Sequence, residues 1–230
     1  MRISIIIPAY NEKGTILDLI RQVRSIQSVS TEIIVVDDAS TDGTRELLQA
    51  LAAPDVRVLF HETNRGKGAA LRTGFAQAGG DIIMAQDADL ELNLPRSLPD
   101  LIRPIITGRA DMVYGSRFQN TPFSLSVHYL ANRFLTELSN LFSGLRLTDM
   151  ETCYKIFSKE ALDGVVIEED RFGVEPELTA YAARRVRDGF RLTEVSVPYI
   201  PRGYSEGKKI GWRDGLWAVW CIFKYNLKNR

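Results

Sequence analysis

Short apolar runs alternate with longer amphipathic segments through the first half of the chain, and this alternation is the strongest constraint on its fold. The apolar runs predict five strands: Ile3–Ile7, Glu32–Val36, Val56–Phe60, Asp81–Ala85 and Asp111–Tyr114. The segments between them carry apolar residues at helical spacing: Thr15–Gln27, Asp42–Ala52, Gly66–Ala78 and Pro95–Thr107. The run Ile33–Val36 is apolar on both faces, as in central parallel strands covered by helices. The sequence therefore predicts the α/β class, with a doubly wound, mostly parallel sheet flanked by helices.

The second half of the chain is less regular. Ser124–Phe142 is predicted to be a helix whose stripe of large apolar residues consists of Leu125, Leu130, Phe134, Leu138 and Leu141. Further predicted elements are a strand at Cys153–Phe157, a helix at Pro176–Arg187, a strand at Phe190–Val197, a Gly-rich basic loop at Arg202–Trp212 and a C-terminal amphipathic helix at Gly215–Asn226. Since no linker interrupts this series, residues 1–230 are expected to form a single domain.

Composition and charge exclude some classes of function. The 29 basic residues balance the 29 acidic ones, so the chain as a whole does not attract nucleic acid, and no nucleic-acid partner is predicted. Cys153 and Cys221 are far apart in the sequence and favour a reducing compartment. The first apolar run is expected to be a buried strand, because it is too short for a signal peptide. No apolar run reaches the roughly 18 residues of a membrane span, so any membrane contact is expected to be peripheral.

Three groups of polar residues each follow a predicted strand. They are Pro8–Glu12, Asp37–Ser40 and Gln86–Asp89. Taken singly, Asn11 or Ser40 would be interpreted as a helix cap. In doubly wound sheets, however, ligands bind beyond the carboxyl ends of the strands, and three such groups at neighbouring strand ends predict a ligand site there.

Asp87 and Asp89 carry the most specific chemistry in these groups. Residues two apart in an extended segment point the same way, so both carboxylates can converge on one point. Without a partner they would repel each other and raise each other's pKa, whereas Mg²⁺ or Mn²⁺ takes one or two carboxylates together with phosphate oxygens. The alternative is a solvated turn. The position after the apolar run Ile82–Met84 favours the metal site.

Other phosphate-binding motifs do not match. Asn64–Gly68 opens a helix, where backbone N–H groups can bind an anion, but Lys67 is followed by Gly68 rather than by the Ser or Thr of a P-loop. No Gly-x-Gly-x-x-Gly follows the first strand, which argues against a dinucleotide-binding dehydrogenase. Arg65 and Lys67 either contact the ligand or solvate the start of the helix, and the sequence favours neither interpretation.

Together these segments resemble glycosyltransferase family 2, whose nucleotide-binding fold is called GT-A. The resemblance is carried by Ile5–Glu12, Val35–Thr44, Asn64–Gly68 and Asp87–Asp89. It implies a nucleotide-sugar donor, GDP-mannose or UDP-glucose, with the diphosphate held through Mg²⁺ or Mn²⁺ on Asp87 and Asp89. The remaining donor-binding residues that it implies are Pro8, Tyr10, Glu12, Asp37, Asp38, Gln86 and Lys208.

The second half resembles the branch of that family that contains dolichol-phosphate mannosyltransferases and other polyprenyl-phosphate hexosyltransferases. The matching segments are Gly115–Phe118, Thr148–Lys155, Phe172–Leu178 and Val197–Ile210. The mannosyltransferase pattern commonly has Ser-Gly-Phe where this chain has Glu151–Cys153, a departure that bears on the sugar more than on the reaction. The resemblance divides the domain into a nucleotide-sugar-binding half, 1–118, and an acceptor-binding half with interfacial helices, 119–230.

The reaction implied here places negative charge on a departing nucleoside diphosphate. The metal on Asp87 and Asp89 would stabilise that charge together with Arg202 and Lys208, with Lys209 as a less certain helper. Gly203 and Gly207 would let their loop fold over the bound donor, although a flexible basic surface loop is the alternative. Asp89, Arg117 and Arg202 are the predicted catalytic residues.

The acceptor determines whether a general base is required. A hydroxyl must lose a proton during attack, whereas a phosphate monoester is largely ionised at neutral pH and needs cations to position it. Arg117 and Arg133 match the positions that the resemblance gives to this acceptor phosphate, with solvation of the helix as the alternative for Arg133. Four carboxylates are candidates for orienting these arginines, and one of them would serve as base if the acceptor is a hydroxyl: Asp149, Glu151, Glu175 and Glu177.

The leading hypothesis is an inverting, metal-dependent transfer of a hexose, with mannose favoured, to a polyprenyl or dolichyl phosphate. The alternatives are glucose transfer from UDP-glucose, transfer to a glycan hydroxyl, and a non-catalytic subunit that binds nucleotide sugars. Ser124–Phe142 and the tryptophans Trp212, Trp217 and Trp220 are candidates for contact with a membrane surface, unless they pack on the sheet or on another chain. The expected location is the cytoplasm, peripheral on the cytoplasmic face of a membrane.

Overall fold

The fold was examined in a computed structural model, which describes residues 1–51, 53–119, 124, 126–200 and 211–227. The side chain of Trp212 is not described. Six residues to which the sequence analysis assigned roles in the loop or the apolar stripe also lie outside the described residues: Leu125, Arg202, Gly203, Gly207, Lys208 and Lys209.

Within the described residues, seven strands form one sheet in the order β3-β2-β1-β4-β6-β5-β7. Their bounds are β1 Arg2–Ala9, β2 Ser30–Asp37, β3 Val56–Phe60, β4 Ile82–Ala85, β5 Met112–Ser116, β6 Lys155–Ser158 and β7 Leu192–Ser196. β6 runs antiparallel to its neighbours β4 and β5, while the other pairs are parallel. The predicted mostly parallel sheet is confirmed, and the carboxyl ends of β1, β2, β4 and β5 lie at the same edge.

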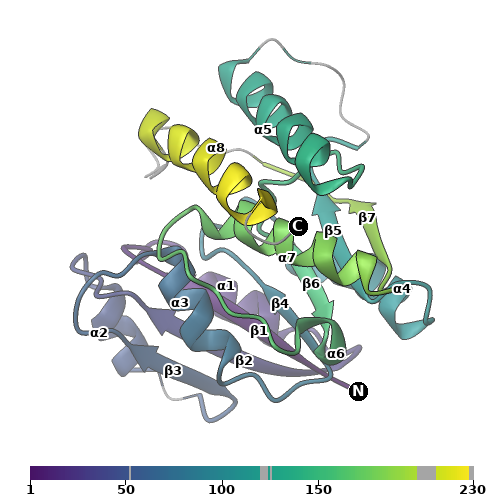
Figure 1. Cartoon of the computed structure of the whole chain (residues 1–230). Helices are drawn as coiled ribbons and strands as arrows, with labels where there is room; N and C mark the ends of the chain where they lie inside the picture. The colour runs from purple at the N-terminus through teal and green to yellow at the C-terminus, as the bar shows by residue number, and fades with distance from the viewer. Residues whose placement is uncertain (52, 120–123, 125, 201–210, 228–230) are drawn as a thin grey trace.

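The helices lie in two layers against the sheet and in a third layer beyond it (Figure 1). Their bounds are α1 Ile16–Arg24, α2 Thr44–Gln49, α3 Lys67–Phe75, α4 Leu94–Ile106, α5 Val127–Ser143, α6 Lys159–Leu162, α7 Val174–Arg187 and α8 Trp212–Leu227. α5 and α8 lie side by side and cover α7 rather than the sheet (Figure 1). The predicted C-terminal helix is confirmed, and the short helix α6 was not predicted.

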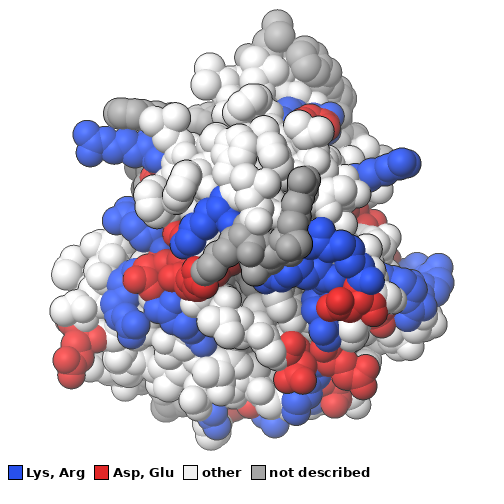
Figure 2. Space-filling model, in the orientation of Figure 1, with Lys and Arg blue, Asp and Glu red and all other residues white. Residues whose placement is uncertain are grey.

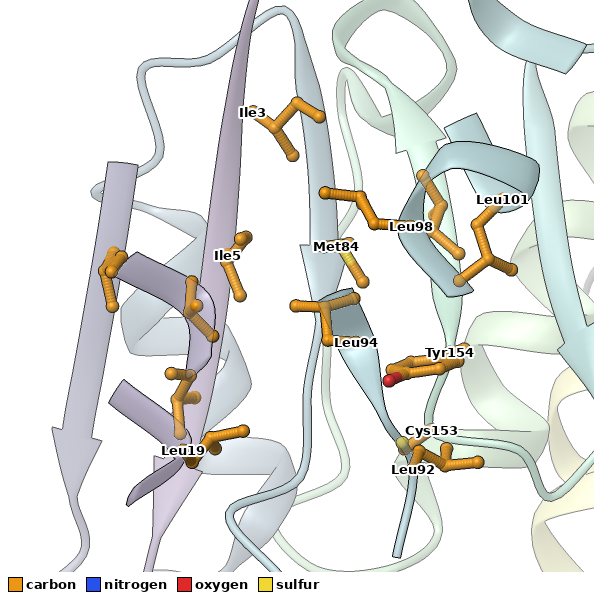
Figure 3. Close-up of a cluster of buried hydrophobic side chains, with 14 of the residues drawn as sticks. Ile3, Ile5, Leu19, Met84, Leu92, Leu94, Leu98, Leu101, Cys153 and Tyr154 are labelled. Carbon is orange, nitrogen blue, oxygen red and sulfur yellow. The ribbon is translucent and has the colours of Figure 1, made fainter. Parts of the chain in front are cut away.

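The core occupies both faces of the sheet because successive side chains of a strand point to opposite faces. Ile3, Ile5 and Ile7 of β1 join the cluster under α1 and α4, whereas Ile6 joins the cluster under α3 and α7. Figure 3 shows the first cluster, in which Leu19 of α1 and Leu98 of α4 pack against β1 and β4. These strands therefore hold their carboxyl ends, and the loops that follow them, in fixed positions.

α5 and α8 pack on each other through a small separate core. Leu135 of α5 and Ala218 and Ile222 of α8 are buried against Met150, and the rings of Phe142 and Phe223 lie 4.7 Å apart. This layer places α5 next to Met150 and the segment that leads into β6. The two helices are thus attached to the part of the chain that carries the predicted acceptor residues.

The start of α3 is pressed against residues 169–171 by two glycines. A Cβ at Gly68 would lie 2.0 Å from the carbonyl oxygen of Glu169, and one at Gly66, whose φ is +99°, would lie 2.4 Å from that of Asp170. The backbone N–H of Ala69 donates to the same Asp170 carbonyl at 3.0 Å. The close approach fixes the position of Lys67 between the two glycines.

Gly68→Ala is expected to destabilise the protein by about 3 kcal/mol or more, because the added methyl group collides with backbone that cannot move aside cheaply. Urea unfolding would measure the change. Gly14→Ala is the matched control, since a Cβ there meets nothing within 4 Å, and it should leave the unfolding midpoint nearly unchanged. Equal unfolding midpoints of the two variants would contradict the close contact between Gly68 and the Glu169 backbone.

Candidate active site

The loops that follow β1, β2 and β4 share an unusual backbone feature. Each contains a residue other than glycine with positive φ: Asn11 at 52°, Ala39 at 60° and Leu90 at 60°. Such conformations cost about 1–3 kcal/mol each and persist where the surrounding structure imposes them, often at functional sites. β2 and β4 both pair with β1, so the three strained loops lie next to one another at one edge of the sheet.

The first two loops are tied together by reciprocal hydrogen bonds. The backbone N–H of Asn11 donates to the Ser40 hydroxyl at 2.9 Å, and that of Thr41 donates to the Asn11 side chain at 2.8 Å. The Glu12 carboxylate accepts a bond from the Thr15 hydroxyl at 2.8 Å. Among the remaining donor candidates, Pro8 lies in β1 opposite Val36 of β2, and Tyr10 is half-buried in the loop.

Two buried acceptor atoms at this edge lack a hydrogen-bond partner among the described residues. They are Oδ1 of Asp37 and Oε1 of Gln86. The other ends of these side chains are fixed: Arg45 donates to Asp37 Oδ2 at 2.8 Å, and the Gln86 amide donates to the Asp87 carbonyl at 2.8 Å. A buried acceptor without a donor costs about 1–3 kcal/mol, so both atoms suit a ligand that supplies N–H or O–H groups.

The Asp38 carboxylate contacts backbone and side-chain groups of the loop that follows β3. Its carboxylate accepts bonds from the backbone N–H groups of Arg65 at 2.9 Å and Gly66 at 2.7 Å, and His61 Nδ1 lies 2.7 Å away. The side chain is buried. Asp38 was predicted to bind the donor. In the structure its carboxylate holds the loop that leads into Lys67, and its role toward the donor stays a prediction.

The Asp87 carboxylate is bound to Lys67. The Lys67 ammonium lies 2.7 Å from Asp87 Oδ1 and 2.8 Å from Glu175 Oε1, and Glu175 also bonds the buried ammonium of Lys155. Burial alone would lower the pKa of Lys67, but Asp87 and Glu175 hold it well above its usual range. Of the two interpretations of Lys67, solvation of the helix start is therefore disfavoured.

The acidic pair after β4 fits a divalent cation. Asp87 and Asp89 both lie close enough to Cys153 that, after burial, their charges raise the pKa of its thiol. The backbone N–H of Glu91 donates to Asp89 at 3.1 Å, which fixes the second carboxylate. Across the part of the chain that the structure describes, no set of three His, Cys, Asp or Glu residues is arranged around a metal position. Two carboxylates suffice for Mg²⁺ or Mn²⁺ when substrate phosphates complete the coordination.

Arg117 is fixed at the end of β5 by Asp149. Its guanidinium donates two parallel bonds to the carboxylate, at 2.7 and 2.8 Å, and its backbone N–H donates a third at 3.0 Å. Glu194 of β7 in turn accepts bonds from the backbone N–H groups of Thr148 and Asp149. The guanidinium thus has a defined position at the same sheet edge as the donor loops.

Two of the four carboxylates that were expected to orient the arginines do other work, which corrects that prediction. Glu175 bonds Lys67 and Lys155. Glu177 accepts the backbone N–H groups of Glu168 and Glu169 at 2.7 and 2.9 Å. Both glutamates lie in the first turn of α7. The start of this helix brings Glu175 to the two lysines and Glu177 to the backbone of residues 168–169.

Arg133 lies on α5 and pairs with Glu137 one turn later at 2.7 Å. Tyr129, one turn before Arg133 on the same helix face, packs edge-on against Phe118 at 5.2 Å. The Arg117 guanidinium lies 5.2 Å from the centre of that Phe118 ring. This contact turns the Tyr129–Arg133 face of α5 toward the end of β5.

Glu151 lies in the turn between Asp149 and β6. Lys155 donates to the carbonyls on either side of it, those of Met150 at 2.8 Å and Thr152 at 2.6 Å. The Oε1 atom of Glu151 is buried and has no hydrogen-bond partner among the described residues. Burial, reinforced by the charge of Glu175, raises the pKa of the Glu151 carboxyl to about 7.

Glu151→Gln is expected to stabilise the protein at pH 8 and to have little effect near pH 4. The pKa of Glu151 is 4.5 in the unfolded chain and about 7 in the folded protein. Ionisation of Glu151 therefore lowers the stability of the folded state as the pH rises above 4.5, and the full loss is reached above about pH 7. The shift corresponds to about 3 kcal/mol at most. Urea unfolding at both pH values measures it, with Glu160→Gln, at an exposed position, as control. A stabilisation independent of pH would contradict this origin.

Comparison with known proteins places the chain in a family. Residues 4–166 match the family model described as glycosyl transferase family 2. The chain belongs to glycosyl transferase family 2. The matched region contains all three strained loops, Lys67, Arg117 and Glu151. The predicted family is therefore confirmed.

Two curated relatives of this family 2 chain carry names from one branch. It is 32% identical to the undecaprenyl-phosphate mannosyltransferase of Micrococcus luteus over 243 residues, which cover 100% of this chain and 96% of that protein. It is 37% identical to the dolichol-phosphate mannosyltransferase of Pyrococcus furiosus over 131 residues, covering 54% of this chain and 37% of that protein. The predicted polyprenyl-phosphate branch is thereby confirmed.

A solved structure shows the same fold. Glucosyl-3-phosphoglycerate synthase from Mycobacterium tuberculosis, in complex with Mn²⁺, UDP and phosphoglyceric acid, matches with a TM-score of 0.72 and 23% identity. The match covers 98% of this chain and 78% of that one. Together with the sheet described above, this similarity confirms the predicted GT-A fold of the family 2 chain.

Sequence reasoning missed several residues that shape this family 2 site. Lys155 is fully buried in β6, Glu194 holds the Thr148–Asp149 backbone, and Arg45 holds Asp37. A signal was present for the first of these, since a lysine inside the apolar run Cys153–Phe157 requires a buried acidic partner. Nothing in the sequence separates Arg45 or Glu194 from ordinary surface charges.

Proposed function

We propose that this family 2 enzyme transfers a hexose, with mannose favoured, from a nucleotide-sugar donor to a polyprenyl phosphate with inversion at the anomeric carbon. The observation that carries this proposal is the Arg117 guanidinium, fixed by two bonds to Asp149 at the sheet edge that also holds the donor loops. The Micrococcus luteus relative, which spans nearly the whole chain, supports mannose and a polyprenyl phosphate. UDP-glucose is the alternative donor.

The donor half of the site binds the nucleotide through the loops after β1 and β2. Asp37 Oδ1 and Gln86 Oε1, which have no partner among the described residues, accept bonds from the nucleoside, with Pro8, Tyr10 and Glu12 around it. Asp87 and Asp89 would hold Mg²⁺ or Mn²⁺, and the bound cation would supply positive charge to the departing diphosphate. Lys67, held by Glu175, adds a second positive charge beside Asp87.

The acceptor half of the site needs no general base. A phosphate monoester is already largely ionised at neutral pH, so one of its oxygens can attack the anomeric carbon while the bond from that carbon to the nucleoside diphosphate breaks. Arg117 positions the phosphate, because a planar guanidinium matches phosphate oxygens, and Asp149 keeps it oriented. Arg133 on α5 is the second cation of this subsite.

The outward faces of α5 and α8 are apolar. The exposed large apolar residues on α5 are Val127, Leu130, Phe134 and Leu141, and those on α8 are Leu216, Trp217, Trp220 and Leu227. α5 buries Leu135 and the small polar residues Thr136, Ser139 and Ser143, so the four exposed apolar side chains lie on its outward face. The surface over these two helices is mostly uncharged (Figure 2). Of the predicted α5 stripe, Leu130, Phe134 and Leu141 are exposed rather than packed on the sheet.

This apolar surface is suited to rest on a bilayer that holds the lipid acceptor. Within the described ranges, no helix combines the length and apolar character that a bilayer span requires. Exposed tryptophan on an amphipathic helix is typical of the headgroup region. Binding through α5 would bring Arg133 and the neighbouring end of β5 toward the lipid phosphate. Attachment to the cytoplasmic face is part of the same proposal.

The double variant Phe134→Glu, Trp220→Glu is expected to bind anionic phospholipid vesicles at least about tenfold more weakly. Each change replaces an apolar side chain that the bilayer would bury with a charged one. Vesicle co-sedimentation measures this. Val166→Glu is the control, since Val166 is 74% exposed and lies outside both helices. Unchanged vesicle binding by the double variant would refute the assigned face.

The proposed reaction is tested by incubating the purified protein with labelled GDP-mannose and UDP-glucose and a short polyprenyl phosphate, with and without Mn²⁺. The expected result is metal-dependent label in the lipid fraction, with GDP-mannose the better donor. Transfer to a glycan hydroxyl in place of the lipid would support the alternative acceptor. Donor binding without transfer to any acceptor would support a non-catalytic subunit.

A further inference from the structure

Glu151 is a carboxyl group inside the site that the proposed reaction does not use. It lies two residues after Asp149, which holds Arg117, and four before Lys155, which bonds Glu175. Glu175 in turn contacts Lys67, and Lys67 contacts Asp87. Along the chain, Glu151 therefore lies between Asp149, which holds the guanidinium assigned to the acceptor phosphate, and Lys155, which joins the series of ion pairs that leads to Asp87.

The backbone around Glu151 is firmly held. Lys155 bonds the carbonyls of Met150 and Thr152, and the Met150 N–H donates to the Thr136 hydroxyl of α5 at 3.1 Å. The N–H of Tyr154 donates to the Thr152 hydroxyl at 3.2 Å. The backbone that carries the Glu151 side chain is thus held in one position, as precise recognition of a small ligand requires.

The cations near Glu151 are engaged by other carboxylates. Arg117 is bonded by Asp149, Lys155 by Glu175, and Lys67 by both Asp87 and Glu175. Glu151 Oε1 remains buried, without a hydrogen-bond partner in the described part of the chain. A purely structural carboxyl in such a place would be expected to pair with one of these cations, whereas a carboxyl that meets a substrate would not.

We propose that Glu151 accepts a hydrogen bond from a hydroxyl group of the transferred hexose and thereby selects the sugar. This inference rests on the proposed function, because the sugar must lie between the diphosphate on the Asp87 side and the phosphate on the Arg117 side. A hexose presents hydroxyl groups in all directions, so it can satisfy the Oε1 atom. The departure of Glu151–Cys153 from the common mannosyltransferase pattern falls at this position.

The expected effect on selectivity is large. A site built to bond a hydroxyl rejects the analogue that lacks it, because the buried polar group is then left without a partner, and a charged acceptor strengthens the effect. We expect the wild-type protein to discriminate about 10- to 100-fold against one donor analogue that lacks a single hydroxyl.

The experiment compares GDP-mannose with its 2-, 3-, 4- and 6-deoxy analogues, and UDP-glucose with the corresponding series. For each, kcat/KM with a short polyprenyl phosphate and Kd without acceptor are measured in wild type, Glu151→Ala and Glu151→Gln. The discrimination against one deoxy analogue should fall to within about threefold of unity in Glu151→Ala, with Glu151→Gln between, because the amide oxygen still accepts but carries no charge. Glu160→Ala is the matched control and should keep the full discrimination.

Discrimination that is the same in wild type and Glu151→Ala, for every analogue in both readouts, would overturn the proposal. The Kd measurement separates this failure from failure of the proposed function, because it needs no acceptor. If Glu151→Ala lost the discrimination between analogues in Kd and no protein formed a lipid product, Glu151 would be supported as the sugar contact. The same result would refute the transfer to polyprenyl phosphate. Failure of both donors to bind would refute both.

Discussion

Asp89→Asn is expected to lower the rate of metal-dependent sugar transfer by about a thousandfold, since the loss of one charged ligand removes charge stabilisation from the departing diphosphate. Initial rates over a range of Mn²⁺ concentrations measure the effect. The amide keeps the size of the side chain, and its oxygen can still accept the bond from the Glu91 N–H. The change should therefore act on cation binding rather than on the fold.

Asp100→Asn is the matched control, because Asp100 lies on α4, is 60% exposed and pairs with Arg103 at the surface. It should retain wild-type activity and the wild-type dependence on Mn²⁺. If Asp89→Asn turned over at the wild-type rate, the assignment of Asp89 to the cation would be wrong. A loss of activity accompanied by an equal fall in thermal stability would instead indicate damage to the loop after β4.

Arg117→Lys is expected to reduce kcat/KM for polyprenyl phosphate by about a hundredfold while leaving KM for the donor nearly unchanged. Lysine keeps the charge but loses the planar pair of hydrogen bonds, which both Asp149 and a phosphate group require. Steady-state kinetics with each substrate varied in turn measure the two constants. Arg103→Lys, the same substitution in an exposed pair, is the control.

A rise in the donor KM equal to the loss in acceptor kcat/KM would contradict the acceptor role of Arg117. Asp149 provides a second check, because it is fully buried and accepts three bonds from Arg117. Arg117→Ala would leave that carboxylate buried without its cation, which costs about 3–5 kcal/mol of stability. The lysine variant avoids most of this cost and is the better test of function.

Much of the fold could be predicted from local patterns. The strands β1 to β5 and the helices between them follow from the alternation of buried runs and helical spacing, and their bounds agree within a few residues. The antiparallel direction of β6 could not be predicted, since Lys155–Ser158 shows only that a short strand is present. Its direction depends on pairing with β4 and β5, which no local pattern records.

The site was predictable at the level of loops but less so at the level of contacts. The three polar groups after β1, β2 and β4 do lie at one sheet edge, because the order of a doubly wound sheet brings these strands together. The series Asp87, Lys67, Glu175 and Lys155 combines residues from the loop after β4 and from α3, α7 and β6. Only the tertiary fold places these charges within bonding distance.

The orientation of α5 shows another limit of sequence patterns. The predicted stripe correctly identified Leu130, Phe134 and Leu141 as neighbours on one helix face. A stripe does not specify whether that face meets the core, another chain or a membrane. The structure shows that all three side chains are exposed, while Leu135 and Thr136 are buried against α8 and the Met150 segment.

A crystal structure with Mn²⁺ and GDP, phased to show the anomalous signal of manganese, tests the central claim most directly. One manganese ion is expected between the carboxylates of Asp87 and Asp89 and the diphosphate, with the Lys67 ammonium moved from Asp87 while it keeps its contact with Glu175. A manganese ion bound by neither aspartate, with the Lys67–Asp87 pair unchanged beside the diphosphate, would contradict the account.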